Sequence, residues 1–513
     1  MRGVLRHRYV VGLALLAVVA ALFGAASFNR HPVAVAQVAV SRSPTRAVVD
    51  ATVRGCPGPG SGGVTGGGAA VAAAPAGPAA TAAAAGQAVV SRLSPGGSTS
   101  AGAAVSSVSQ PGKLAVTAVP VAPAVPASRG TAQDSAGSAV PTVAGQGGIM
   151  ISATGLMSQG FAAEQTGAAG TVTARCGAPG TDFWFAGPGQ QTAANIQLYL
   201  LNVDGQQADV QVTAVTDSGP LPASADTGIV VPPHGLVIQS LAKLLQRSRY
   251  AGLHVIVSLG RVVATVRETS APSKPGGWLP PTQAPARLLV LPGLPGTSGA
   301  RELYVAVPGA SNAQVKVTAV TAKGTYQPTA GGGTDLPGGS AAAIPLPSLG
   351  GIPAAVQVTS NVPVVAAMMM PGGADGSPGA FTVATAPVSE QGVIAGLPGA
   401  AAGSAELVLS APQAAATVRI GEATQAAAFG SLPASVLQVP AGHTVVVRLR
   451  PPVGVSGPAA FAAVLTPLAG SGALYAGIVL RAGGSVQSIL PVISALTSIR
   501  LPPVRSSLTA VLP

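Results

Sequence analysis

The segment Val210-Gln-Val-Thr-Ala-Val-Thr216 recurs as Val315-Lys-Val-Thr-Ala-Val-Thr321, with six of seven residues identical at a spacing of 105 residues. At the same spacing, Gln197-Leu-Tyr-Leu200 matches Glu302-Leu-Tyr-Val305, and Glu406-Leu-Val-Leu409 marks a further copy. Fixed-period self-similarity is the sequence signature of a chain built from repeated structural units. The matches therefore predict repeats of about 100 residues, three of them clear and a fourth, weaker one near the N-terminus.

Within the repeated segment, apolar and polar residues alternate in the way that is typical of a β-strand. Val210, Val212 and Ala214 fall on one face, and the residues between them fall on the other. Several such strands, separated by turns rich in Gly and Pro, favour an antiparallel sandwich. One helix is expected inside a repeat, over Ser240–Tyr250, where Leu241, Leu244 and Leu245 share one side.

The N-terminus predicts export. Arg2, Arg6 and Arg8 precede an uncharged run over residues 10–29, which has about the 20 residues that a membrane-spanning helix needs. We interpret residues 1–9 as a cytoplasmic basic tail and residues 10–29 as a transmembrane signal anchor; a cleaved signal peptide is the alternative. The chain is then either a single-pass protein of the cell membrane with its bulk extracytoplasmic, or a secreted protein.

The expected fold class is all-β: an N-terminal transmembrane helix followed by three or four tandem β-sandwich-like repeats. The expected boundaries are repeat 1 at residues 30–168 with a flexible Gly/Ala/Pro-rich insertion at 57–86, repeat 2 at 169–270, a linker at 271–285, repeat 3 at 286–388, and repeat 4 with a C-terminal tail at 389–513.

Composition and charge exclude several classes of protein. Only 8% of the residues are charged, too few for a long coiled coil or a charged disordered chain. The net charge of +12 is concentrated at the two ends, because residues 1–54 carry seven Arg and one Asp, and residues 419–513 carry six Arg and one Glu. Nucleic-acid binding needs clustered basic residues with a recognition motif or stacking aromatics, so no nucleic-acid partner is expected.

The two cysteines, Cys56 and Cys176, predict one disulfide bond, because an even pair in an exported chain is normally oxidised. The bond would close a loop of about 120 residues, for which chain entropy gives roughly 4–5 kcal/mol of stabilisation. A pair of buried free thiols is the alternative.

The search for chemistry predicts no catalytic, cofactor-binding or metal-binding residues. The chain has no P-loop and no nucleophile elbow, and its one local group of acids (Asp182, Asp204, Asp209 and Asp217) is interpreted as turn residues. Trp184, in the aromatic group Asp182-Phe-Trp-Phe185, and Arg448 with Arg450, on one side of a predicted strand, are possible ligand contacts. Core packing for the aromatic group and a solvated strand face for the arginines are the plainer interpretations.

The groups Arg54-Gly-Cys-Pro57, Arg175-Cys-Gly-Ala-Pro179 and Asp182-Phe-Trp-Phe185 resemble a family of uncharacterised actinobacterial exported proteins of about 500 residues, known as a domain of unknown function. The N-terminal anchor and the Gly/Pro-rich β repeats also resemble that family. The resemblance covers nearly the whole chain. It implies a cell-envelope setting and carries over no activity.

Three functions are consistent with the sequence. The leading hypothesis is a non-enzymatic, membrane-anchored scaffold or interaction module that binds other envelope components. The first alternative is a carbohydrate-binding or glycan-assembly accessory protein that contacts cell-wall polysaccharide. The second is a hydrolase whose active site is assembled from distant repeats. No cofactor is expected, and the oligomeric state is left open.

Overall fold

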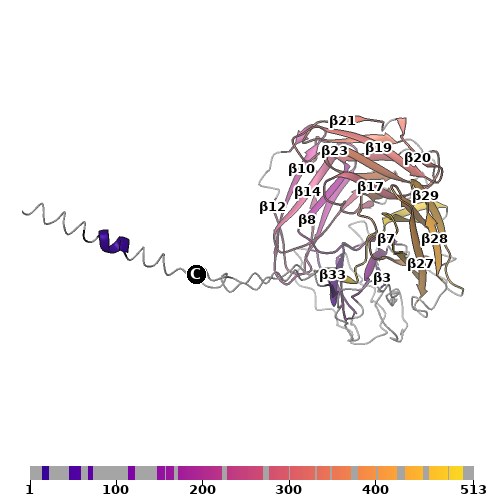
Figure 1. The fold of residues 1–513 in the computed structure, drawn as a ribbon, viewed down its shortest axis with the longest axis horizontal. Coiled ribbons are helices and arrows are strands. Elements are labelled where there is room, and N and C mark those ends of the chain that lie inside the picture. The colour runs from indigo at the N-terminus through magenta and orange to yellow at the C-terminus, as the bar shows by residue number, and fades with distance from the viewer. Residues whose placement is uncertain are drawn as a thin grey trace, which may run out of the picture. The chain divides into compact units, whose positions relative to one another are not determined.

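The computed structural model of the chain is built almost entirely of β-strands (Figure 1). It describes residues 14, 16–21, 46–58, 68–72, 114–121, 147–155, 158–166, 172–221, 228–269, 276–297, 299, 301–329, 332–346, 349–370, 379–399, 403–424, 434–453, 461–482 and 484–500. Residues 14 and 16–21 are helical, and no helix in the described part of the chain is long and apolar enough to span a membrane. The remainder of the predicted span 10–29 lies outside the described residues.

Residues Arg46–Arg500 form one compact unit, which contains all the sheets. Eight groups of strands occur as four pairs in chain order, and we call them sheet pairs 1 to 4. In each pair, the sheet that holds the first strand is the a-sheet and the other is the b-sheet.

The two sheets of pair 1 have three strands each. The a-sheet has the order β2 (Ala51–Cys56), β5 (Gly148–Thr154), β4 (Leu114–Val119), and the b-sheet has the order β3 (Gly68–Ala72), β6 (Ala162–Thr166), β7 (Val172–Arg175).

Pair 2 repeats this order and adds strands to it. Its a-sheet is β8 (Asp182–Pro188), β14 (Tyr250–Leu259), β10 (Ala208–Thr216), with β11 (Gly219–Pro220) and β12 (Gly228–Val231) beside β10. Its b-sheet is β13 (Leu236–Ser240), β9 (Asn195–Leu201), β15 (Val263–Thr269), β16 (Gly277–Leu279).

In pair 3 the two sheets are continuous through one long strand, β23 (Ala354–Met370). The first half of β23 lies between β17 (Ala286–Leu294) and β19 (Ala313–Thr321), with β20 (Gly324–Tyr326) and β21 (Thr334–Leu336) beside β19. The second half lies between β18 (Arg301–Ala306) and β24 (Ala380–Val383), and β22 (Ala341–Leu346) pairs with β18.

Pair 4 has the same order as pair 2. Its a-sheet is β25 (Gly392–Leu397), β30 (Phe461–Pro467), β27 (Ala416–Thr424), β28 (Ser435–Val439), and its b-sheet is β29 (His443–Leu449), β26 (Ser404–Ala411), β31 (Tyr475–Ala482), β32 (Ser485–Pro491). The sequence segments that match one another lie on corresponding strands. Residues 210–216 and 315–321 form most of β10 and most of β19, and 197–200, 302–305 and 406–409 lie on β9, β18 and β26.

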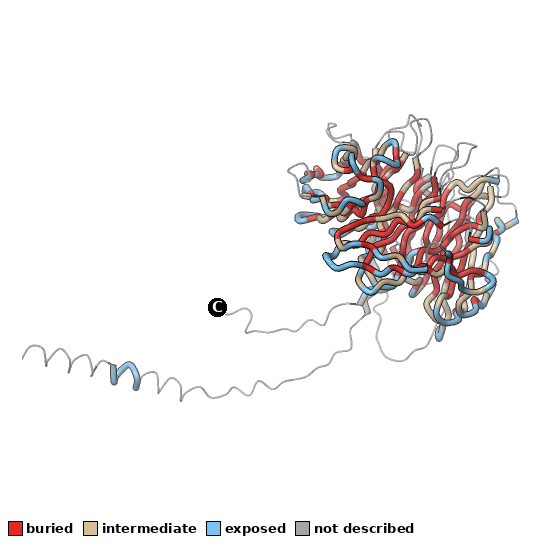
Figure 2. The backbone as a smooth tube through the Cα atoms, turned by 90° about the horizontal axis from the view of Figure 1, so that it is seen from above, coloured by how far each residue is buried: buried red, intermediate tan, exposed pale blue. Residues whose placement is uncertain are grey.

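In pairs 2 to 4 the two sheets pack face to face around a shared apolar core, which the alternating pattern of the strands produces. In pair 2, Val210, Val212 and Ala214 of β10 pack with Leu198 and Leu200 of β9, and all five are at most 5% exposed. Pairs 3 and 4 have corresponding clusters of their own. In Figure 2 the buried residues lie in the interior of the unit and the exposed residues mostly at its periphery.

Each sheet pair also contacts the next one, and at every contact the a-sheet of one pair meets the b-sheet of the following pair. From pair 2 onward, the last strands of neighbouring b-sheets also contact each other. Pair 1 meets pair 2 where Val119 packs with Leu201 and Val263. Pair 2 meets pair 3 along β8 and β14 against β18 and β22. Pair 3 meets pair 4 where Val290 and Val320 pack with Tyr475.

The fourth contact returns to the start of the chain, because β25 of the a-sheet of pair 4 contacts β3 and β6 of the b-sheet of pair 1. The four contacts therefore form a closed cycle. Near this closure, β1 (Arg46–Val48) pairs antiparallel with β33 (Ser498–Arg500), so the first and last residues of the compact unit, Arg46 and Arg500, are paired in register.

Three details of the expected organisation are wrong. Residues 241–249 form turns and not a helix: Leu241 and Leu245 are buried in the core of pair 2, which leaves room for only one turn between β13 and β14. The insertion expected at 57–86 contains strand β3, whose backbone hydrogen-bonds to β6. The linker expected at 271–285 contains β16, which completes the b-sheet of pair 2.

Close approach of the backbones at the contact between pairs 3 and 4 requires glycine. A Cβ atom added to Gly477 would lie 2.5 Å from the Cα atom of Gly293, which itself has a φ of 84°. A Cβ added at Gly421, on β27, would meet nothing within 4 Å. Gly477 is therefore a contact residue between sheet pairs, and Gly421 is a matched strand glycine without such a contact.

We expect Gly477→Ala to lower the free energy of unfolding by about 1–3 kcal/mol, because the added methyl group must push the two backbones apart. Gly421→Ala should stay within about 0.5 kcal/mol of the unchanged chain. Denaturant unfolding of the three proteins measures the difference, and equal losses in both variants would contradict the proposed contact.

Candidate functional site

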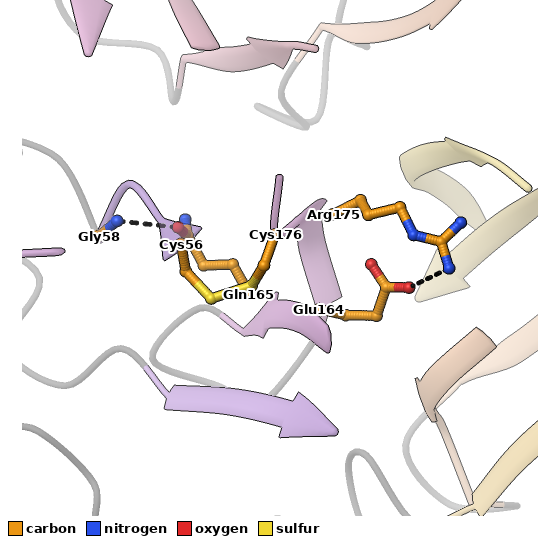
Figure 3. The surroundings of a disulfide bond; sticks show 6 residues. All are labelled: Cys56, Gly58, Glu164, Gln165, Arg175 and Cys176. Atoms are coloured by element: carbon orange, nitrogen blue, oxygen red, sulfur yellow. Dashed lines mark hydrogen bonds and ion pairs between the residues drawn. A yellow bond between two sulfur atoms is a disulfide. The ribbon is translucent and has the colours of Figure 1, made fainter. Parts of the chain in front are cut away.

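The disulfide bond predicted from the sequence is present, and it joins the two sheets of pair 1. Cys56 is the last residue of β2, Cys176 follows β7, and their Cα atoms are 4.4 Å apart (Figure 3). Both cysteines are almost completely buried. The bond spans 120 residues of sequence, so it links the strands on either side of the long segment between β2 and β7.

Glycines beside the two cysteines let sheet pair 2 pack directly over the bond. Gly55 and Gly177 exchange two backbone hydrogen bonds, each 2.9 Å long. A Cβ atom on either glycine would lie 2.8 Å from the side chain of Val263 of β15. The disulfide is therefore covered by the first contact of the cycle.

A buried group of charges lies on the same strands. Glu164 on β6 is 1% exposed, and its Oε1 atom is 3.1 Å from Nη2 of Arg175 on β7 (Figure 3). The other oxygen, Oε2, accepts no hydrogen bond from any described residue. Arg54 on β2 is close enough to act on Glu164 electrostatically, and it donates hydrogen bonds to Oγ1 of Thr52 and the carbonyl of Val53.

Arg175 also carries the closing contact of the cycle. Its guanidinium donates hydrogen bonds to the carbonyl of Val393 on β25 and to the carbonyl of Pro491, the last residue of β32. One side chain therefore connects the disulfide-linked sheets of pair 1 with both sheets of pair 4. The neighbouring Gln165 accepts a 2.9 Å hydrogen bond from the backbone N–H of Gly58, which fixes the chain just after Cys56.

Burial dominates the protonation of this group. It raises the pKa of Glu164 to about 7, although the positive charges of Arg175 and Arg54 act in the opposite direction. Burial, together with repulsion by Arg175, lowers the pKa of Arg54 to about 10. Two arginines and one glutamate leave the group with an excess positive charge when Glu164 is ionised, and with a larger excess when it is protonated.

Trp184 lies on the outer face of the a-sheet of pair 2, beside the contact with pair 3. Its ring stacks on His254 of β14 with 3.7 Å between ring centroids and 12° between planes. His254 Nε2 is 3.0 Å from Oδ1 of Asp182, which is 62% exposed. Phe183 and Phe185 point into the core, as strand alternation requires. Trp184 is thus partly exposed, with one face covered by an imidazole.

Arg448 and Arg450 are both exposed, at the end of edge strand β29 in pair 4. Arg448 lies opposite Glu406 of β26, and Glu406 Oε2 is 3.3 Å from Nε of Arg481. Trp184 and the two arginines lie on different sheets, so the structure does not bring them together on one face.

The four acids of the local group are separated and engaged. Asp204 accepts two hydrogen bonds from Arg261, of 2.7 and 2.9 Å, and these hold its pKa below the usual value. Asp217 accepts a backbone hydrogen bond from Arg249, Asp209 accepts one from the side-chain amide of Gln207, and Asp182 contacts His254. In the described ranges, no three His, Cys, Asp or Glu side chains are grouped so that they could hold a metal ion.

A family of unknown function, DUF5719, matches residues 128–450, which is more than half of the chain. The chain belongs to this family. The resemblance to a family of unknown function, based on the residues around Cys56, Cys176 and Trp184, is thereby confirmed. Among curated proteins, none matches the chain. The matched region of DUF5719 contains Glu164, Arg175 and Cys176 and begins after Arg54 and Cys56.

The search for motifs missed the buried charges, although a signal was present. An arginine stands close before each cysteine, in Arg54-Gly-Cys56 and in Arg175-Cys176, and Glu164 follows the apolar run Phe161-Ala-Ala163. The grouping depends on strand pairing, because β6 lies between β3 and β7 and its register brings Glu164 opposite Arg175.

The raised pKa of Glu164 predicts an unusual pH dependence. Between pH 4.5 and about 7 the folded chain keeps a proton on Glu164 that the unfolded chain releases, so the free energy of unfolding falls as the pH rises through this window. The full shift corresponds to about 3 kcal/mol. Glu164→Gln cannot release a proton and should lack this loss.

Denaturant unfolding of both proteins at pH 5 and pH 8 measures the effect. The free energy of unfolding of Glu164→Gln, relative to that of the unchanged chain, should be about 3 kcal/mol higher at pH 8 than at pH 5. A difference that is the same at both pH values would show that Glu164 keeps an ordinary pKa.

Proposed function

We propose that this protein is a non-enzymatic scaffold of the cell envelope, anchored in the membrane by residues 10–29, with its sheets outside the cell. The observation that carries the proposal is the closed cycle of contacts between the four sheet pairs, with Arg175 hydrogen-bonded across its closure. Such a body holds its surfaces in fixed relative positions, which is what a protein that positions other components requires.

We also propose that the four sheet pairs arose by repetition of one unit. The matching strand orders and the 105-residue spacing support four tandem repeats of one β-sandwich unit, of which pair 1 has the fewest described strands. The disulfide supports an extracytoplasmic setting, because such bonds persist in oxidising compartments.

The anchor is tested on the full-length chain in a bacterial host. We expect the chain to stay in the membrane fraction at alkaline pH and to have a mass that includes residues 1–29. The variant Leu16→Arg with Val19→Arg should move it to the soluble or secreted fraction, because an arginine at the centre of a span costs about 2.5–3.5 kcal/mol. A mature chain that lacks residues 1–29 would establish the signal-peptide alternative.

The scaffold role is tested by cross-linking the tagged full-length chain in intact cells and analysing protein and glycan separately. A specific protein partner that is captured by the unchanged chain, and less by Gly477→Ala, is the expected result, because the partner surface depends on the arrangement of the sheet pairs. Capture of polysaccharide without protein would overturn the scaffold role.

A second candidate, a carbohydrate-binding accessory protein, is favoured by the Trp184 face. A partly exposed indole beside the exposed carboxylate of Asp182 and the imidazole of His254 offers an apolar surface with polar groups at its margin. On this hypothesis, Trp184→Ala reduces retention on envelope polysaccharide about tenfold or more, which is about 1.4 kcal/mol. Tyr326→Ala, at an aromatic residue that is 40% exposed on another sheet, is the control and should change nothing. Equal retention of both variants would exclude Trp184 as the contact.

A further inference from the structure

The disulfide bond of pair 1 lies under the first contact of the cycle, where solvent does not reach it. Cys56 is 0% exposed and Cys176 is 2% exposed. Thiol–disulfide exchange requires an attacking thiolate to reach one of the two sulfur atoms. The bond therefore cannot exchange with a thiol in solution until some part of the protein moves away from it.

The strands of pair 1 are held in place around the bond. Cys56 is the last residue of β2, and β2 pairs with β5 along its whole length. The backbone N–H of Cys176 donates a 2.9 Å hydrogen bond to the carbonyl of Ala163 on β6. The disulfide itself joins the two sheets of the pair (Figure 3). These strands therefore cannot separate at the bond while it is intact.

Sheet pair 2 supplies the part of the cover that can move. Three glycines of pair 1 face it, and a Cβ atom added to Gly55, Gly148 or Gly177 would lie 2.8 Å or less from a side-chain atom of Val263 or Leu201. The backbone of pair 1 is thus in direct contact with β9 and β15, with no space for a reagent between them. This contact is noncovalent, so it can open while the disulfide stays intact.

We infer that sheet pair 2 acts as a gate on the disulfide: Cys56 and Cys176 exchange with thiols and disulfides only while the contact between pairs 1 and 2 is open. The redox state of the two cysteines is then set before pair 2 docks and is retained afterwards. Chain that is oxidised before docking keeps its bond in a reducing medium. Chain that docks while reduced keeps two thiols that an oxidant does not reach. The inference does not rest on the membrane anchor or on the scaffold role.

Reduction by dithiothreitol reports on the gate. One thiolate of the reagent attacks a cysteine sulfur and displaces the other cysteine as a thiolate, and the second thiolate then displaces the first cysteine and closes a cyclic disulfide. Two electrons pass to the protein, the reagent is oxidised, and the two protons of the dithiol end on the cysteines. The first step needs access to a sulfur atom, so its rate in folded chain measures how often the contact is open.

The test measures how fast dithiothreitol reduces the folded, oxidised full-length chain in detergent. The chain has only two cysteines, so alkylation followed by mass measurement counts the reduced molecules directly. Val263→Ala removes two methyl groups from the contact between pairs 1 and 2. The control is Val320→Ala, which removes the same groups from a residue that is 0% exposed at the contact between pairs 3 and 4.

We expect the unchanged chain to be reduced about a hundredfold more slowly when folded than when unfolded in urea, because the contact is rarely open. Val263→Ala should speed the reduction of folded chain about tenfold, since a contact weaker by about 1.4 kcal/mol is open that much more often. Val320→Ala should change the rate by no more than about twofold.

Equal rates in the two variants would show that exchange does not depend on the contact between pairs 1 and 2, and would overturn the gate. Reduction of the folded, unchanged chain as fast as in urea would show that thiols reach the bond freely, and would overturn it as well. If Val263→Ala does not fold, Val119→Ala, in the same apolar cluster, takes its place.

Discussion

The outer face of each a-sheet must fit the b-sheet of the next pair, and the fourth fit must bring the chain back to its first sheets. Contacts of this head-to-tail kind continue as an open array unless the rotation at each contact closes the set. The cycle can therefore close only if the two sheets at each contact lie at a limited distance from each other. Gly477 against Gly293, and Gly252 with Ala306, mark places where two backbones approach so closely that a larger residue would change the angle between sheet pairs.

The closing contact differs from the other three in its chemistry. The first three are largely apolar, whereas at the fourth Arg175 donates to backbone carbonyls 218 and 316 residues away in sequence and pairs with the buried Glu164. A buried ion pair adds little net stability, but it favours the arrangement in which both partners meet, because breaking it leaves an unpaired buried charge. The disulfide beside it links β2 to the residue that follows Arg175, so the position of Arg175 at this contact is fixed on both sides of pair 1.

Much of this architecture could be predicted from the sequence, and the reasons differ between elements. The alternation in Val210–Thr216 fixes the strand and its buried face, so the all-β class and the core residues follow from local pattern. The cysteine pairing follows from the presence of only two cysteines and from the export that the N-terminal sequence predicts. The turns at 241–249 could not be predicted, because Leu241, Leu244 and Leu245 have helical spacing over the length of one turn. Strands β3 and β16 are too poor in β-branched residues to show a pattern, and they exist because β6 and β15 offer them hydrogen bonds. The pairing of Glu164 with Arg175 could not be predicted, because it depends on the register between β6 and β7.

The two candidate binding faces, one with Trp184 and Asp182 and one with Arg448, belong to sheets that also contact the neighbouring sheet pair. On the a-sheet of pair 2, Gly252 lies beneath Ala306 of pair 3. Asp182 pairs with Ile256, four residues further along β14, and is exposed. On β29, Thr444 hydrogen-bonds to the carbonyl of Val320 in pair 3, whereas Arg448 is exposed. Each face is thus covered at one end by the neighbouring pair and open at the other. A ligand on the open end would sit beside the next sheet pair, so its binding would depend on the closed cycle as much as on the side chains it touches.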